Sequence, residues 1–129
     1  KIRIKIWQEY QKAFSKIDCL QTPAPDEPNT VHARHLYALV LKPEMLKVGR
    51  NKFVSALQAE GIGTGVHFTP VHLHPYYRKT FGYKPGDFPV SEKIGLNIFS
   101  IPLYPTMSKK DVKDVIKAVE KLINYYRRK

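Results

Sequence analysis

The sequence predicts an α/β fold in which amphipathic helices alternate with short strands over 129 residues. Apolar residues recur at three- and four-residue spacing in residues 1–17, in residues 51–60 and after Ser108, as in helices that pack on a core. A continuous apolar run, residues 36–41, is too short for a core helix and indicates a buried strand. A hydrophobic fraction of 43% is ordinary for a chain that buries such a core.

The N-terminal part predicts a helix followed by an extended connection. The apolar stripe of the helix consists of Ile6, Tyr10, Ala13, Phe14 and Ile17. Three prolines within residues 21–30 remove backbone donors and disfavour helix, so this stretch should be extended. The length fits one domain, with this helix and connection in residues 1–30 and an α/β core in residues 31–129.

Alternating apolar residues and glycines predict a strand over residues 62–68. One face of this strand carries Ile62, Thr64, Val66 and Phe68. The other face has almost no side chains, because glycine recurs at positions 61, 63 and 65, so another group can approach the backbone closely. Gly61 is also placed to end the preceding helix in the left-handed conformation.

The rest of the chain predicts a third strand and a long C-terminal helix. A stable sheet needs more than two strands, so we expect a third near residues 99–103. Ser108 and Asp111 have the spacing of a capping box. The apolar face that follows consists of Val112, Val115, Ile116, Val119, Leu122, Ile123 and Tyr126. We expect residues 69–89 to be irregular, apart from a short helix near residues 74–80.

Charge is the strongest compositional signal, with 22 Lys and Arg against 11 Asp and Glu and a formal net charge of +11. Such an excess favours a nucleic acid, an anionic lipid, a phosphorylated small molecule or an acidic partner domain. The basic, aromatic run at residues 125–129 could bind RNA, but cations also stabilise the C-terminal end of a helix. No stretch approaches the roughly 20 apolar residues of a membrane-spanning helix, so we expect no membrane partner.

A single cysteine, Cys19, excludes an internal disulfide framework and suggests a small apolar filler. A reducing, cytoplasmic setting follows as the default expectation. The chain also starts without an initiator Met, at Lys1, which suggests a piece of a longer protein.

The richest cluster of polar and aromatic side chains lies in residues 66–78, which hold three imidazoles, three aromatic rings, two prolines and an arginine. Imidazole and arginine donate to phosphate or sugar oxygens, and tyrosine offers a flat face and a hydroxyl. The cluster therefore suits a polar, phosphorylated, ring-bearing ligand. A proline-braced structural loop that buries its aromatic rings is an equal alternative.

Other chemistry finds little support in the sequence. His67, His72 and His74 could in principle supply three zinc ligands, but no cysteine pair or helical histidine pair accompanies them, so we expect no metal. Ser100 and Ser108 have no obvious base, and Ser108 is better explained as a helix cap. The residues predict a binding surface without catalytic machinery.

Residues 61–77 (GIGTGVHFTPVHLHPYY) and 100–105 (SIPLYP) resemble the DegT/DnrJ/EryC1/StrS aminotransferase family. The order of the predicted helices and strands is also similar to that family, over nearly the whole chain. The resemblance implies the C-terminal small domain of a type I transferase dependent on pyridoxal 5′-phosphate (PLP), with a small, mostly antiparallel sheet flanked by helices.

The resemblance further implies a large N-terminal domain, absent from this chain, that carries the lysine holding PLP as a Schiff base. The parent enzyme would be a homodimer that transfers an amino group, commonly from glutamate, to a nucleotide-linked keto sugar. The chain by itself should be inactive, with apolar surface left exposed. A nucleic-acid-binding module and a non-catalytic, regulatory relative remain the alternatives, and we do not favour nucleic acid.

The family's substrate-binding element falls on His67, Phe68, Pro70 and His72, and we extend the prediction to Tyr76, Tyr77 and Arg78. These residues would form the sugar-nucleotide side of the cleft. Gly65 stands where the family often has serine, which removes one possible hydroxyl contact. Gly95 lies in a stretch that is usually helical in the family, so we expect an irregular helix there.

Overall fold

A computed structural model describes residues 1–128 of the chain, and Lys129, the last residue of the basic C-terminal run, lies outside the described part. Three strands form one antiparallel sheet in the order β1-β2-β3. The central strand β2 (Tyr37–Leu41) pairs with β1 (Leu20–Gln21) on one side and with β3 (Ile98–Ile101) on the other. The α/β class and the antiparallel sheet predicted from the sequence are confirmed.

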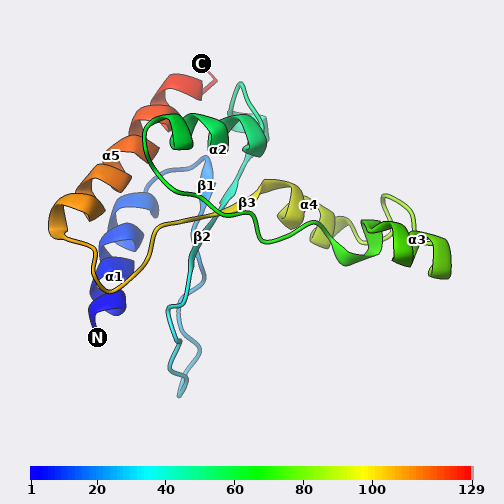
Figure 1. The fold of residues 1–129 in the computed structure, drawn as a ribbon, viewed down its shortest axis with the longest axis horizontal. Helices are drawn as coiled ribbons and strands as arrows, with labels where there is room; N and C mark the ends of the chain where they lie inside the picture. Colours follow the sequence, from blue (N-terminus) through cyan, green and yellow to red (C-terminus); the bar gives the residue numbers. More distant parts are fainter. Residues whose placement is uncertain (129) are drawn as a thin grey trace.

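Helices surround the sheet on one side and extend from it on the other (Figure 1). The helices of the described residues are α1 (Ile2–Phe14), α2 (Arg50–Ala59), α3 (Pro75–Phe81), α4 (Pro89–Asn97) and α5 (Lys109–Tyr126), with short 3₁₀ turns η1 (Pro43–Met45) and η2 (Val71–Leu73). Both α1 and α2 contact α5. None of these helices is both long and apolar enough to span a membrane.

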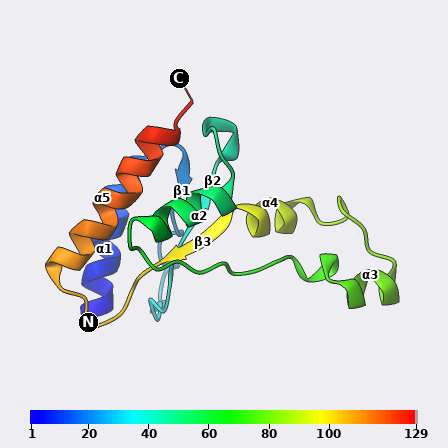
Figure 2. The same cartoon turned by 45° about the horizontal axis from the view of Figure 1, so that its top comes forward.

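Residues 66–97, here called the side lobe, project from the body of the molecule and carry α3 and α4 (Figure 2). Its outer helix, α3, has no buried residue. Most of the exposed large apolar side chains of the described residues lie in this lobe: Val66, Phe68, Val71, Tyr76, Tyr77, Phe81, Phe88, Val90, Ile94 and Leu96. The exposed apolar surface expected from the resemblance is therefore concentrated on the lobe.

The core lies between the sheet and helices α1, α2 and α5. Alternate side chains of β2, those of Tyr37, Leu39 and Leu41, are buried, as a half-covered sheet requires. The rings of Tyr10 and Tyr37 meet edge to face with centroids 5.2 Å apart, and the Tyr10 hydroxyl donates to the Pro102 carbonyl at 2.8 Å. Cys19 is fully buried and burial raises the pKa of its thiol, which agrees with its predicted role as an apolar filler.

The C-terminal helix follows its prediction closely. Ser108 Oγ accepts from the Asp111 N–H at 3.1 Å, and Asp111 Oδ2 accepts from the Ser108 N–H at 2.8 Å, which is a complete capping box. Beyond the helix, Arg127 pairs with Asp18 at 2.8 Å and Arg128 Nε donates to the Leu46 carbonyl at 2.7 Å. The basic groups at these two positions therefore serve contacts within the chain.

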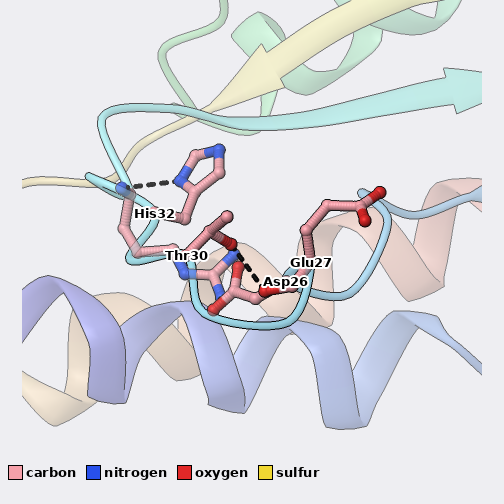
Figure 3. A network of polar contacts seen from close by, with 5 residues as sticks. Asp26, Glu27, Thr30 and His32 are labelled. Carbon is pink, nitrogen blue, oxygen red and sulfur yellow. Dashed lines mark hydrogen bonds and ion pairs between the residues drawn. The ribbon is translucent and has the colours of Figure 1, made fainter.

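The connection between β1 and β2, residues 22–36, is the loop of a long hairpin (Figure 1). Its tip is turned by a hydrogen bond from the Thr30 hydroxyl to the Glu27 carbonyl at 2.7 Å (Figure 3). At its return, His32 Nδ1 accepts from the backbone N–H of Arg34 at 2.9 Å, and the Arg34 guanidinium pairs with Asp26 at 2.6 Å. The extended connection predicted at residues 21–30 is thus one limb of a hairpin.

The predicted strand at residues 62–68 is wrong. Only Gly65 joins the sheet there, through an isolated bridge to Ser100. Glycines at 61, 63 and 65 offer no side chains to pack on a pleated surface, and the chain leaves the sheet after one bridge to enter the side lobe. The strand that completes the sheet is β1, which the sequence analysis did not anticipate because only two residues form it.

Several element boundaries also differ from prediction. The first helix ends at Phe14 rather than at residue 17, and the third strand covers 98–101 rather than 99–103. The short helix near 74–80 is confirmed as α3, and Gly61 takes the expected positive φ of 78°. The expected irregularity at Gly95 is wrong, because α4 runs through it without a break.

Candidate functional site

His67 lies at the base of the side lobe, where the chain leaves the sheet. Its Nε2 is 2.7 Å from the Ser100 hydroxyl on β3, within hydrogen-bonding distance. The adjoining Phe68 ring meets the imidazole edge to face at 5.0 Å between centroids and is 73% exposed. The imidazole of His67 and the exposed ring of Phe68 thus lie together beside Ser100 at the edge of the sheet. The sequence analysis did not identify this imidazole neighbour of Ser100.

Pro70 is buried within the side lobe, where it packs against helix α4. A Cβ added to Gly95 on α4 would lie 2.7 Å from Pro70 Cδ and 2.9 Å from the Phe68 carbonyl oxygen. Only glycine lets α4 approach this closely, which explains why it interrupts a helical sequence. Pro70 therefore packs between two segments of the lobe.

His72 is also buried, with 6% of its surface exposed. Its Nε2 donates to Glu92 Oε1 at 2.9 Å, and the same oxygen accepts from the Gly86 N–H at 2.7 Å. The hydrogen bond from His72, followed by that from Gly86, holds the pKa of the Glu92 carboxyl below its usual value. The Phe88 ring packs on the imidazole at 4.8 Å between centroids. His72 thus braces three segments of the lobe from within.

The three remaining predicted residues, Tyr76, Tyr77 and Arg78, lie on α3 and are all exposed. The Tyr77 ring stacks on Phe81 with centroids 6.0 Å apart. A hollow of about 380 Å³ opens beside them, lined by Val71, His72, Tyr77, Phe81, Tyr83, Phe88 and Ser91. The predicted residues therefore divide into the half-buried His67, four exposed residues at the base and on α3, and a buried pair, Pro70 and His72.

The histidines at 67, 72 and 74 do not form a metal site. Within residues 1–128, no group of three or more His, Cys, Asp or Glu side chains is placed to hold a metal ion. Nε2 of His67 contacts Ser100, that of His72 contacts Glu92, and that of His74 lies 3.3 Å from the Thr69 carbonyl oxygen. Each imidazole therefore has a local partner on a different segment.

A second hollow, of about 420 Å³, lies between α1 and α5. Its walls carry Ile6, Val112 and Ile116, with Lys5 and Lys113 also lining it. It is larger than the hollow in the side lobe, but no histidine or aromatic ring lines it. The chemistry expected of a sugar-nucleotide site is concentrated on the lobe instead.

Comparison with known proteins places this arrangement in a family. The family model described as DegT/DnrJ/EryC1/StrS aminotransferase family matches residues 1–120. The chain belongs to the DegT/DnrJ/EryC1/StrS aminotransferase family. The match includes the side lobe with both exposed parts of the candidate site, as well as the sheet that supports it.

Known relatives agree with this membership. The spore coat polysaccharide biosynthesis protein SpsC of Bacillus subtilis is 46% identical over 124 residues, which are 95% of this chain and 32% of SpsC. The crystal structure of S. venezuelae DesV, in complex with a ketimine intermediate, is 26% identical with a TM-score of 0.80 and covers 93% of this chain and 30% of DesV. The PLP form of the putative sugar aminotransferase Spr1654 from Streptococcus pneumoniae shares the fold, with 24% identity, a TM-score of 0.82 and coverage of 95% and 31%. The chain spans about a third of the length of the curated relatives it matches.

The structure adds three residues to the candidate site that the sequence analysis did not assign to it. Ser100 contacts His67, Glu92 contacts His72, and Gly95 admits Pro70. Ser100 begins the SIPLYP motif that resembles the family, so a signal for it was present. For Glu92 the sequence offers no such signal. Its position in the first turn of the helix that starts at Pro89 does not reveal a contact with His72, 20 residues away.

Proposed function

We propose that the chain is the C-terminal small domain of a PLP-dependent aminotransferase that transfers an amino group, from glutamate, to a nucleotide-linked keto sugar. The observation that carries the proposal is the lobe of this family member, which holds an imidazole and an exposed aromatic ring at its base and two tyrosines and an arginine near its tip. The similarity to SpsC, a polysaccharide biosynthesis protein, supports a sugar as the acceptor.

The side chains of the lobe suit the parts of such a substrate. The imidazole of His67 can donate to or accept from sugar hydroxyl groups, and the rings of Phe68 and Tyr76 offer apolar faces to a sugar or a base. The guanidinium of Arg78 can bind a diphosphate with two parallel hydrogen bonds. His72 and Pro70, which are buried, would act by holding these groups in place.

The burial of polar side chains in residues 1–128 supports a PLP site outside this chain. A Schiff-base lysine lies in a protected pocket beside groups that hold the ring nitrogen and the phosphate. No lysine among residues 1–128 is buried, and the only buried polar or charged residues are Arg34, His72 and Ser100. We therefore propose that a larger N-terminal domain holds PLP and that the chain is inactive without it.

The exposed apolar side chains of the lobe support the same proposal. Phe68, Tyr76 and Phe81 are each more than half exposed, which is costly for a chain that acts by itself in water. We propose that the large domain, within a cytoplasmic homodimer, covers this surface and completes the cleft. The net charge of +11 would then attract the diphosphate of the nucleotide and complement an acidic large domain.

The test is an absorbance spectrum of the full-length protein with PLP, recorded before and after addition of glutamate. A Schiff-base band that converts to the pyridoxamine form is the expected result and demonstrates the donor half of the reaction. A protein that forms no Schiff-base band would overturn the proposal and favour a non-catalytic, regulatory relative. A band that responds to another amino acid but not to glutamate would overturn the choice of donor.

A further inference from the structure

Gly65, His67 and Ser100 form a compact unit at the edge of the sheet. The backbones of Gly65 and Ser100 exchange two hydrogen bonds, of 3.1 and 2.8 Å, as neighbouring strand residues do. Two residues later, the His67 side chain folds back over the same pair and places Nε2 2.7 Å from the Ser100 hydroxyl. The imidazole therefore rests on the bridge that starts the side lobe.

The glycine at 65 is required by space rather than by backbone conformation. Its φ lies outside the left-handed region that favours glycine, whereas Gly61 has a φ of 78°. A Cβ at position 65 would lie 2.7 Å from Nε2 of His67, which is closer than real Cβ atoms approach their neighbours, and 3.0 Å from Oγ of Ser100, which is a tight contact. Gly63, two residues earlier, has nothing within 4 Å of the same position. Any side chain at 65 would thus displace the imidazole from Ser100.

Ser100 is placed to hold the ring and not to attack a substrate. It is only 6% exposed and lies within β3, so a ligand outside the protein cannot reach its hydroxyl. The Ser100 hydroxyl is hydrogen-bonded to Nε2 of His67, and no hydrogen bond within residues 1–128 involves Nδ1 of that ring. The second nitrogen of the ring is left for a ligand.

We propose that Gly65 and Ser100 are positioning residues for His67: Ser100 holds the imidazole through Nε2, Gly65 supplies the clearance, and the ring meets the substrate through Nδ1. The identity of that substrate as a nucleotide-linked sugar rests on the proposed function. From the sequence alone, Gly65 only removes a possible hydroxyl contact. In the structure, the missing side chain at position 65 is what allows the His67 ring to take this orientation.

The ring orientation is tested by ¹⁵N resonances of labelled histidine in the full-length protein, with His67→Gln to assign the signals. Ser100→Val and Ser100→Thr are a matched pair, because both add the same bulk but only threonine keeps the hydroxyl. Gly65→Ala and Gly63→Ala are a second pair that differ in clearance. The Nε2 resonance of His67 should shift in Ser100→Val and Gly65→Ala and stay near its original position in Ser100→Thr and Gly63→Ala. An unchanged resonance in Ser100→Val and Gly65→Ala, or an equal shift in both members of either pair, would overturn the proposal.

Binding of the glucose conjugates of uridine and thymidine diphosphate, which carry sugar hydroxyl groups for His67 to contact, is measured by calorimetry on the same proteins and tests the consequence for the site. Displacing a binding group by about 1 Å can cost up to roughly 100-fold, so Ser100→Val and Gly65→Ala should weaken binding of whichever conjugate the protein takes. Equal affinity in all four variants would overturn the positioning role. If the unaltered protein binds neither conjugate, the nucleotide-linked substrate is wrong, and the histidine resonances still decide the orientation of His67.

Discussion

The guanidinium of Arg34 lies over the indole ring of Trp7, with Cζ 3.7 Å from the ring centroid. The same guanidinium pairs with Asp26 at 2.6 Å, and Arg34 is only 8% exposed. Its φ of 49° is uncommon for a residue other than glycine. One side chain therefore attaches the long hairpin loop, residues 22–36, to helix α1.

Arg34→Lys should destabilise the protein by about 1–2 kcal/mol, because a lysine keeps the charge but loses the planar group that stacks on Trp7. The free energy of unfolding in urea measures the loss. Asp26→Asn is the control, since it removes the ion pair and leaves the stack in place. A loss in Asp26→Asn as large as that in Arg34→Lys would show that the ion pair, rather than the stack, attaches the loop.

Gly95→Ala should destabilise the protein by about 1–3 kcal/mol through overpacking against Pro70. Helix propensity predicts the opposite sign, a gain of roughly 1 kcal/mol for alanine within a helix. Unfolding of the variant therefore discriminates between packing and propensity. Ser91→Ala, an exposed position on the same helix, should change stability by less than about 0.5 kcal/mol.

A second substitution tests the cause of that loss. Pro70→Ala removes the ring atoms that the new Cβ would meet, so the double variant should lose less stability than the two single variants added together. Strict additivity in this cycle would show that Gly95 and Pro70 do not interact.

Glu92→Gln should lower the unfolding temperature at pH 7, and the difference from the unaltered protein should disappear in acid. The folded-state pKa of Glu92 lies below its ordinary value of 4.5, so its ionised form stabilises the native state above that value. This stabilisation is lost as the pH falls through the lowered pKa, because the carboxyl then takes up a proton in both states. Unfolding temperatures recorded from pH 7 to pH 3 test this, and a constant difference across the range would contradict it.

Under the proposed function, Arg78→Ala should raise KM for the nucleotide sugar in the full-length protein by roughly 10- to 100-fold, the range expected for lost hydrogen bonds to a charged phosphate. Lys79→Ala is the matched control, because it removes a charge from the next position of the same exposed helix. Steady-state kinetics on both variants separates the two cases. An equal rise in KM would mean that the lobe attracts the substrate by net charge and that Arg78 makes no specific contact.

Periodicity and turn chemistry were sufficient to predict most of the fold. The apolar faces of α1, α2 and α5, the capping box at Ser108 and the positive φ of Gly61 follow from local rules and are all present. The failures concern contacts that are distant in sequence. A two-residue strand such as β1 has no periodicity to detect, and residues 62–68 alternate like a strand although only Gly65 pairs.

The candidate site shows the same division. The residues at 66–78 were found because their types suit a phosphorylated ligand and because the segment resembles a known family. Their unequal exposure could not be predicted, since it depends on α4 returning along the lobe to place Glu92 beside His72. Sequence reasoning therefore proposed the segment, and the three-dimensional arrangement was needed to separate its exposed side chains from its buried ones.

The bridge between Gly65 and Ser100 also bears on how this part of the molecule can vary. The chain leaves the sheet at Gly65 and rejoins it by Ser100. These two residues are hydrogen-bonded to each other, so the segment between them is a loop that is closed at its base. The entropic cost of closing such a loop grows only slowly with its length. Insertions and deletions within residues 68–97 can therefore reshape the exposed surface of the lobe while the strands beneath keep their register.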